Sequence, residues 1–153
     1  MHDFNYIIQS KIRFDIHDSG DINIPNKNGV YLIYAIINSD HPDLLVDGIK
    51  NGLNINQNLG DGWTPIHEAI DGAIDGMIQN NLDLPYPVTI EFIKILLNNG
   101  ATLDECDKRG HKPLDALNTY AANIDTFNHL KNVLRTSIPD IDDKVTFNKS
   151  KTT

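Results

Sequence analysis

The stretch GDGWTPIHEA, at residues 60–69, carries the pattern that decides the fold. Thr64 and Pro65 predict the start of a helix, because a threonine hydroxyl can accept a hydrogen bond from a free backbone N–H and proline at the first helical position leaves no N–H unpaired. Apolar residues then recur at helical spacing, at Ile66, Ile70, Ile74 and either Met77 or Ile78. The pattern therefore predicts a helix over residues 65–80.

The same landmarks recur on both sides of this stretch. Gly29 precedes Gly62 by roughly 33 residues and is followed by apolar residues in matching register. The distance from Gly62 to Gly110 equals the distance from Gly52 to Gly100. Gly52 and Gly100 each close an apolar stretch. This distance exceeds the spacing between Gly29 and Gly62 by roughly 15 residues. A unit therefore repeats along the chain, and its second copy carries an insertion of that length. Polar residues match in the same register: Asp21 with Asn54 and Thr102, and Asn23 with Asn56 and Asp104.

This repeat resembles the ankyrin repeat, which has a period of about 33 residues and a Thr-Pro-Leu-His-x-Ala signature. The match is strongest in the second unit; the first unit lacks Thr, Pro and His, and the third keeps Pro113 and Leu114 but has Asp115 in place of His. The resemblance covers residues 19–135. It implies an all-α solenoid of stacked helix-turn-helix units with projecting β-turn fingers, in which stacking supplies the core that one helix pair lacks.

The register divides the chain into five parts: a partial repeat or N-terminal cap (1–24), a first repeat (25–57), a second repeat with the insertion (58–105), a third repeat that closes the stack (106–138) and a polar tail (139–153). Further helices are predicted near residues 31–38, 43–51, 89–99, 113–121 and 125–135. Residues 81–87 are predicted to separate two helices, because Pro85 and Pro87 cannot continue one. The opening residues 4–16 fit a strand or a capping helix, of which we favour the helix, and the tail is expected to fray.

Composition favours a soluble, cytosolic protein, and we expect the chain to be a monomer when free. The chain has 153 residues, of which 40% are hydrophobic, and a formal net charge of −8. This charge argues against nucleic acid and anionic membranes as partners and favours a basic protein, although it could equally serve solubility alone. The single cysteine, Cys106, excludes an internal disulfide. Neither a signal peptide nor an apolar run long enough to span a bilayer is evident.

Two residues suggest chemistry that their surroundings do not support. His67-Glu68 matches part of a zinc-protease signature, but Asp71 stands where the second histidine would be required. The ankyrin resemblance implies instead that His67 ties the start of its helix to the neighbouring turn. Cys106 lies between Glu105 and Asp107, which disfavour the thiolate that a nucleophile needs. We therefore expect no metal, no cofactor and no catalytic residue.

Ten residues are predicted to contact a protein partner. Trp63 follows the glycine of its finger, and tryptophan is enriched at binding hot spots, although it could instead pack on the insertion or a neighbouring finger. Asp71 and Asp75 lie on the helix that, by the resemblance, lines a concave face; the alternatives are a solvated pair or an acid–base pair. Tyr86 lies in the insertion, which is either a recognition element or a tolerated loop. The other six occupy finger positions: Lys27, Asn28, Asp61, Lys108, Arg109 and His111.

These features predict a protein-binding module, and three hypotheses about its function remain open. The first is an immunity protein, because an abundance of Asn, Ile, Lys and Asp is typical of AT-rich bacterial genomes and small bacterial ankyrin proteins resemble the antidotes of secreted toxins. An acidic chain would then bind a basic toxin domain. The second is a general adaptor or effector that binds another cellular protein. The third is a hydrolase or metal-dependent enzyme, for which no nucleophile, base and pocket are evident together.

Overall fold

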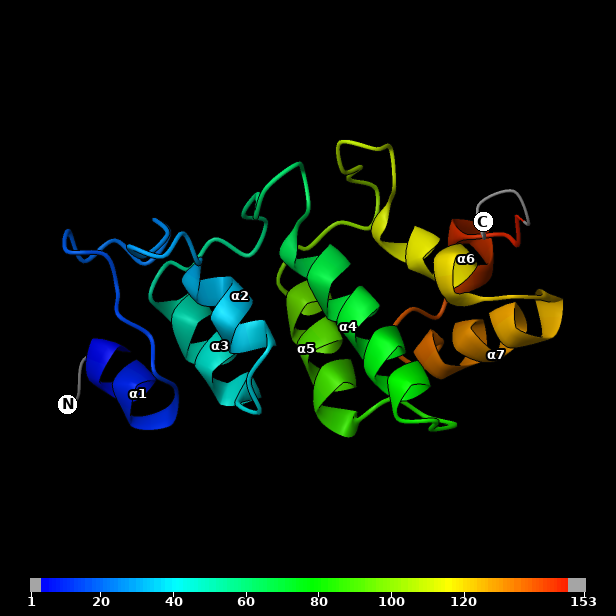
Figure 1. Cartoon of the computed structure of the whole chain (residues 1–153), viewed down its shortest axis with the longest axis horizontal. Helices are drawn as coiled ribbons and strands as arrows, with labels where there is room; N and C mark the ends of the chain where they lie inside the picture. The colour runs from blue at the N-terminus through cyan, green and yellow to red at the C-terminus, as the bar shows by residue number, and fades with distance from the viewer. Residues whose placement is uncertain (1–3, 149–153) are drawn as a thin grey trace.

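The computed structural model describes residues 4–148, and within this range the regular elements are all helices with no strand, which confirms the predicted all-α class. The helices follow one another in a row (Figure 1). They are α1 (Phe4–Lys11), α2 (Leu32–Ile37), α3 (Pro42–Lys50), α4 (Pro65–Gln79), α5 (Pro87–Asn98), the 3₁₀ turn η1 (Pro113–Asp115), α6 (Ala116–Tyr120), α7 (Ile124–Leu134) and α8 (Ile141–Lys144). None of these helices has the length and apolar character that crossing a membrane requires.

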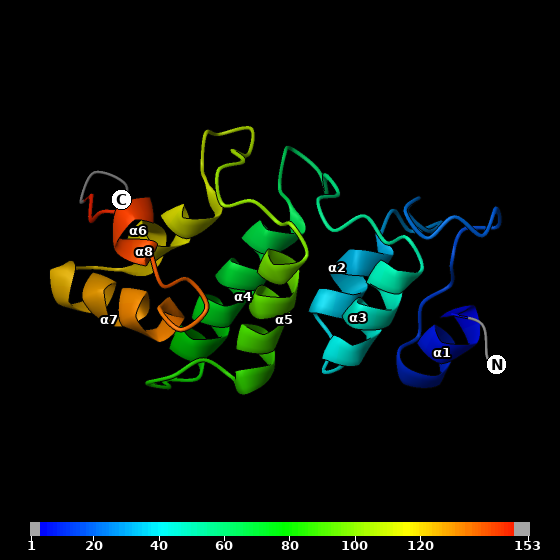
Figure 2. The same cartoon turned by 180° about the vertical axis from the view of Figure 1, so that it is seen from behind.

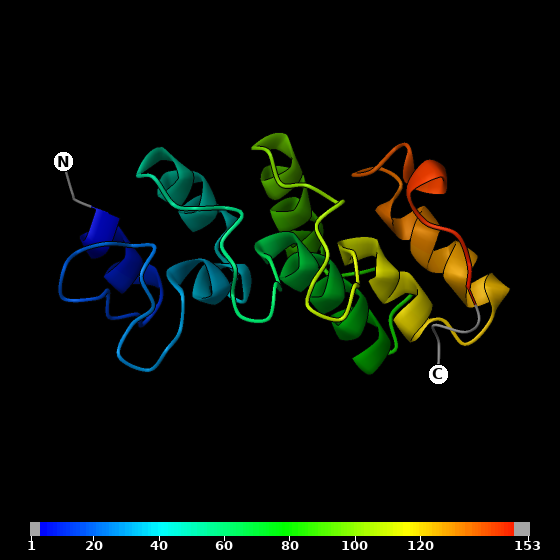
Figure 3. The same ribbon diagram turned by 90° about the horizontal axis from the view of Figure 1, so that it is seen from above.

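Six of the helices pack as three successive pairs: α2 with α3, α4 with α5, and α6 with α7. The middle pair joins the others, because α4 contacts α2 on one side and η1 and α6 on the other, while α5 contacts α3. Seen from above, the pairs lie one after another along the molecule (Figure 3). The helix α1 covers α3 at the N-terminal end, and α8 packs on α7 at the opposite end (Figure 2).

The helix pairs enclose one continuous apolar core, and α4 contributes its predicted stripe to it. Ile66, Ile70, Ile74 and Met77 are at most 2% exposed, whereas Ile78 is 43% exposed. Met77 is therefore the fourth core position of α4. The helix ends at Gln79, one residue before the predicted end.

Three loops project from the same side of the helix row, and we call residues 17–30, 52–64 and 100–112 the first, second and third loops (Figure 1). Each loop turns at a glycine with a left-handed backbone: φ is 78° at Gly29, 79° at Gly62 and 83° at Gly110. In each loop one side-chain oxygen accepts hydrogen bonds from the N–H groups two and four residues further along the chain. The three oxygens belong to Asn26, Asn58 and Asp107.

The polar residues that match between the units form hydrogen-bonded junctions. The Asn23 amide donates to the carbonyl of Gly52 at 3.0 Å and accepts from the N–H of Asn54 at 2.7 Å. One unit further on, the Asn56 amide reaches the carbonyl of Gly100 at 3.5 Å. Asn23, Asn56 and the matching Asp104 each donate their backbone N–H to the side chain two positions earlier, which belongs to Asp21, Asn54 and Thr102 in turn. The matching sequence positions therefore make matching local contacts.

Two helix starts differ in kind from the sequence-based expectation, and the choice between strand and helix at the N-terminal end is resolved. Pro87 begins α5 instead of preceding it, because a proline at the first helical position leaves no N–H unpaired. The predicted helix at 113–121 begins as the 3₁₀ turn η1 before becoming α6. Residues 4–11 form the favoured capping helix and not a strand, and Phe4 and Ile8 are buried against the rest of the core.

The expectation that the tail frays is wrong for residues 139–148. Ile141 is fully buried and Val145 is 7% exposed, because their spacing of four residues places both on one face of the short helix α8 and its C-cap. The side chain of Asn118 bonds to the backbone of residues 146 and 148, and the rings of Phe127 and Phe147 lie 5.4 Å apart. Residues 149–153 of the predicted tail lie outside the described residues.

We expect Ile141→Val to lower the free energy of unfolding by about 1 kcal/mol, because it removes one buried methylene from this contact. Urea denaturation measures the difference. The control is Ile124→Val, whose side chain is 47% exposed and whose effect should stay within about 0.5 kcal/mol. Equal effects of the two substitutions would contradict the packing of the tail on the core.

Candidate protein-binding surface

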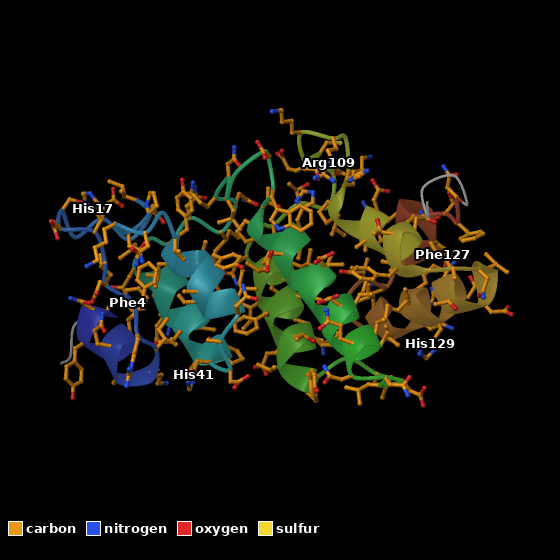
Figure 4. The ribbon with its side chains drawn as sticks, viewed as in Figure 1. Phe4, His17, His41, Arg109, Phe127 and His129 are labelled. Carbon is orange, nitrogen blue, oxygen red and sulfur yellow. The ribbon has the colours of Figure 1, made fainter. Side chains whose placement is uncertain are left out.

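A groove between the second and third loops collects six of the ten residues predicted to contact a partner. We call it the loop groove; it has a volume of about 440 Å³. It extends from the loops to the second turn of α4 and to η1 and α6, and Arg109 stands at the tip of the third loop (Figure 4). The six predicted residues that line it are Asp61, Trp63, Asp71, Lys108, Arg109 and His111.

The two loops are fixed against each other by a backbone contact. The N–H of Lys108 donates to the carbonyl of Asp61 at 2.7 Å. A side chain at position 62 would place its Cβ only 3.0 Å from the Cα of Asp107, so the close approach requires Gly62. The groove is therefore a built feature of the fold, because the two loops that form its walls are bonded to each other.

His67 joins the start of α4 to the third loop. Its side chain is 1% exposed, and its Nε2 lies 2.9 Å from the carbonyl oxygen of His111. Its Nδ1 lies 3.2 Å from the N–H nitrogen of Thr64 and 2.7 Å from the Thr64 hydroxyl, within a capping box at the start of α4. Nδ1 therefore accepts and Nε2–H donates. The predicted structural role is confirmed, and both ring nitrogens are occupied.

Trp63 is held in a fixed orientation at the edge of the groove. Its ring lies 4.9 Å from the ring of His67, and its Nε1–H donates to Oε1 of Glu68 at 2.9 Å. The indole thus packs on the first turn of its own helix while it lines the loop groove. A large aromatic side chain that is already ordered loses little conformational entropy when a partner binds it.

Three carboxylates, Glu68, Asp71 and Asp75, follow one another along the exposed side of α4, and we call them the acidic row. Glu68 accepts from Trp63 and from the Asn38 amide, the latter at 3.2 Å. Asp71 and Asp75 both bond to the hydroxyl of Tyr120, and Asp75 also accepts from the amide of Gln79. All of these donors are uncharged, and none of the ion pairs formed within residues 4–148 involves the acidic row.

The surroundings of Asp71 disfavour its charge. Burial raises the pKa of Asp71, and the charges of Glu68 and Asp75 raise it further, against the hydrogen bond from Tyr120, which lowers it. Burial, together with the two aspartates, also raises the pKa of Tyr120 above its usual value. A cation brought beside the acidic row would remove this penalty.

We expect Asp71→Asn to raise the melting temperature at pH 7 by about 1–2 °C. Because the folded-state pKa of Asp71 is raised, its contribution to stability is present below the unfolded pKa and is lost as the pH rises through the folded pKa. The advantage of Asn should therefore shrink as the pH falls toward about 4. Thermal melts at both pH values test this. The control is Asp83→Asn, an exposed residue with the same charge change; the same gain there would contradict a local cause.

The other four predicted contact residues lie outside the loop groove. Lys27 lines a separate hollow between the first loop and α1, and Asn28 is exposed in that loop. Asp75 lies one turn beyond Asp71 on α4, and Tyr86 borders a different groove beside the insertion. Six of the ten predicted residues therefore lie together, around the second and third loops, and the other four lie elsewhere.

The sequence reasoning missed a set of polar residues that line the loop groove at the end of the third loop and on η1 and α6: Lys112, Asp115 and Thr119. Their spacing of three and four residues places them on one helical face, which was the available signal. Tyr120, which bonds to Asp71 and Asp75, was missed as well. Its role depends on the contact between α6 and α4, and no local pattern indicates that contact.

Within residues 4–148, no group of three or more His, Cys, Asp or Glu side chains is placed to hold a metal ion. Cys106 is an exposed free thiol in the third loop. Comparisons of the chain with family models, with curated proteins and with solved structures gave no match. The function is therefore inferred from the geometry of the chain itself.

Proposed function

We propose that this chain is a non-enzymatic, ankyrin-type binding module that acts as a bacterial immunity protein and neutralises a basic toxin by covering part of its surface. The observation that carries the binding proposal is the loop groove, where six residues chosen from the sequence pattern lie together on two fixed loops and the first helix of a repeat. A preformed surface with an ordered aromatic residue at its edge suits recognition of a folded protein.

The repeating contacts support the ankyrin part of the proposal. Left-handed glycines recur at the same place in three loops, side-chain junctions recur between units, and three helix pairs stack in sequence. His67 makes the contact that the resemblance implies for this position.

The charge distribution supports a basic partner. The chain has a formal net charge of −8, and the acidic row forms no ion pair within the described residues. A partner lysine or arginine would find carboxylates that are already oriented by neutral donors. Such complementarity accelerates association and rejects acidic proteins.

Capture from the native cell followed by a growth assay tests the function. The tagged chain should retain one basic protein in stoichiometric amount, and expression of that protein alone should arrest growth that co-expression of this chain restores. Retention of several unrelated proteins without any toxicity would favour the adaptor hypothesis. Retention of no protein would contradict the binding function.

A further inference from the structure

The insertion creates a second groove on the other side of α4. The helix α4 has 15 residues and α2 has 6, so at 1.5 Å per residue α4 is about 13 Å longer. The shorter α2 leaves part of α4 and the start of α5 uncovered, and a groove of about 420 Å³ lies there. We call it the insertion groove. Its bed is mostly apolar: Ile37, Ala69, Gly72, Ala73, Phe92 and the ring of Tyr86.

Contacts within the chain hold the wall of this groove in place. Tyr86 lies over Gly76, where an added Cβ would be 3.8 Å from its ring, and its carbonyl accepts from the hydroxyl of Thr89 at 2.6 Å. Nε2 of His129, on α7, lies 2.7 Å from the carbonyl oxygen of Asp83. The insertion is therefore ordered before any partner binds, which reduces the entropy that binding would cost.

The bed of the groove is open at Gly72. A Cβ placed on Gly72 meets no atom within 4 Å, and glycine inside a helix costs about 0.5–1 kcal/mol relative to alanine. The insertion also leaves four large apolar side chains exposed, each by 38% or more: Ile78, Leu82, Leu84 and Tyr86. Of these four, Tyr86 lines the insertion groove, and exposed apolar side chains that gather beside a groove are typical of interaction sites.

The charges around the insertion groove have a single sign. Glu68 and Asp40 line it, and it has no lysine, arginine or histidine in its lining. The loop groove differs, because Lys108 and Arg109 line it together with aspartates. Both oxygens of Glu68 are held by neutral donors, from Trp63 and Asn38, so its charge faces the insertion groove uncompensated.

We propose that the insertion groove is a second docking site, which takes a bulky apolar side chain flanked by lysine or arginine in a segment of the basic partner. The apolar side chain lies over Gly72, and the flanking cations pair with Glu68 and Asp40. The inference rests on the proposed protein-binding function and adds a second anchor to it. Two separated anchors on one partner raise the affinity beyond that of either alone.

Peptide titrations of the full chain, labelled with ¹⁵N, test the proposal. The probe is acetyl-KKLFKK-amide at millimolar concentration, and the controls are EELFEE and KKSSKK with the same ends. The amide of Gly72 reports on the insertion groove, which it lines. The amides of Gly62 and Gly110 report on the loop groove, because each lies between two residues that line it. We expect KKLFKK alone to shift the Gly72 signal strongly and saturably.

A blocking variant makes the test specific. Gly72→Leu places a side chain at the bed of the groove, where its Cβ meets no atom within 4 Å, and its melting temperature should rise, because leucine is the better helix former. We expect this variant to bind KKLFKK at least about 10-fold more weakly, a loss of about 1.4 kcal/mol. The matched control Asn98→Leu places the same side chain at an exposed position of α5 and should bind as the parent does.

The outcomes separate this inference from the proposed function. Shifts confined to Gly62 and Gly110 would overturn the second site and leave the loop groove as the binding surface. Equal shifts of Gly72 with KKSSKK would overturn the apolar anchor. If neither cationic peptide shifted any of these amides, both the second site and the basic partner would be contradicted.

Discussion

The variant His67→Ala is expected to lose about 3 kcal/mol of unfolding free energy, a large share of the stability of a small domain. The substitution leaves a cavity in a site that is 1% exposed. It also removes the hydrogen-bond partners of the Thr64 N–H and of the His111 carbonyl, and unpaired buried groups of this kind cost about 1–3 kcal/mol each. The start of α4 and the third loop would lose the contact that joins them.

Urea denaturation at neutral pH measures this effect, and His111→Ala is the matched control. The control removes an imidazole from the loop groove but keeps the backbone carbonyl that His67 contacts. We expect it to change the free energy of unfolding by about 0.5 kcal/mol or less. If His67→Ala were no more harmful than His111→Ala, the link between α4 and the third loop would not be structural.

Trp63→Ala is expected to weaken binding of the captured partner by about 30-fold or more, which corresponds to about 2 kcal/mol. The indole is the largest aromatic group in the loop groove, and its bond to Glu68 and its contact with the ring of His67 fix it before binding. Truncation removes the contact area and also releases Glu68. Calorimetry of the purified pair measures the loss.

Val30→Ala is the control for this experiment, because Val30 holds the equivalent place in the first loop, outside the loop groove. Its effect on affinity should stay below about threefold. A circular dichroism melt of each variant confirms that it is folded. Equal losses for Val30→Ala and Trp63→Ala would show that binding does not depend on the loop groove.

The sequence alone was enough to predict the helical units and the loops between them, because both depend on local signals. The Thr64-Pro65 start and the apolar spacing of α4 predict a helix that the structure confirms to within one residue. Gly29, Gly62 and Gly110 predict tight turns, and all three have a left-handed backbone. A repeating sequence also repeats these signals, which is why the loop residues could be matched between units.

The contacts between distant segments could not be predicted in this way. Tyr120 contacts Asp71 only because α6 packs on α4. The insertion groove exists only because α4 is longer than α2. The tail was misjudged because its polar composition hides Ile141 and Val145, whose burial depends on the end surface formed by the last helix pair. In each case the decisive partner lies in another unit of the chain.

Site-specific photo-crosslinking in the native cell tests the central claim, that a protein partner occupies the loop groove, most directly. A photoreactive amino acid at position 109, at the tip of the third loop (Figure 4), is compared with the same amino acid at position 94, which is exposed on α5 and outside the loop groove. Our account predicts one dominant crosslinked protein from position 109 and little or none from position 94. Efficient crosslinking from position 94 with none from position 109 would contradict it.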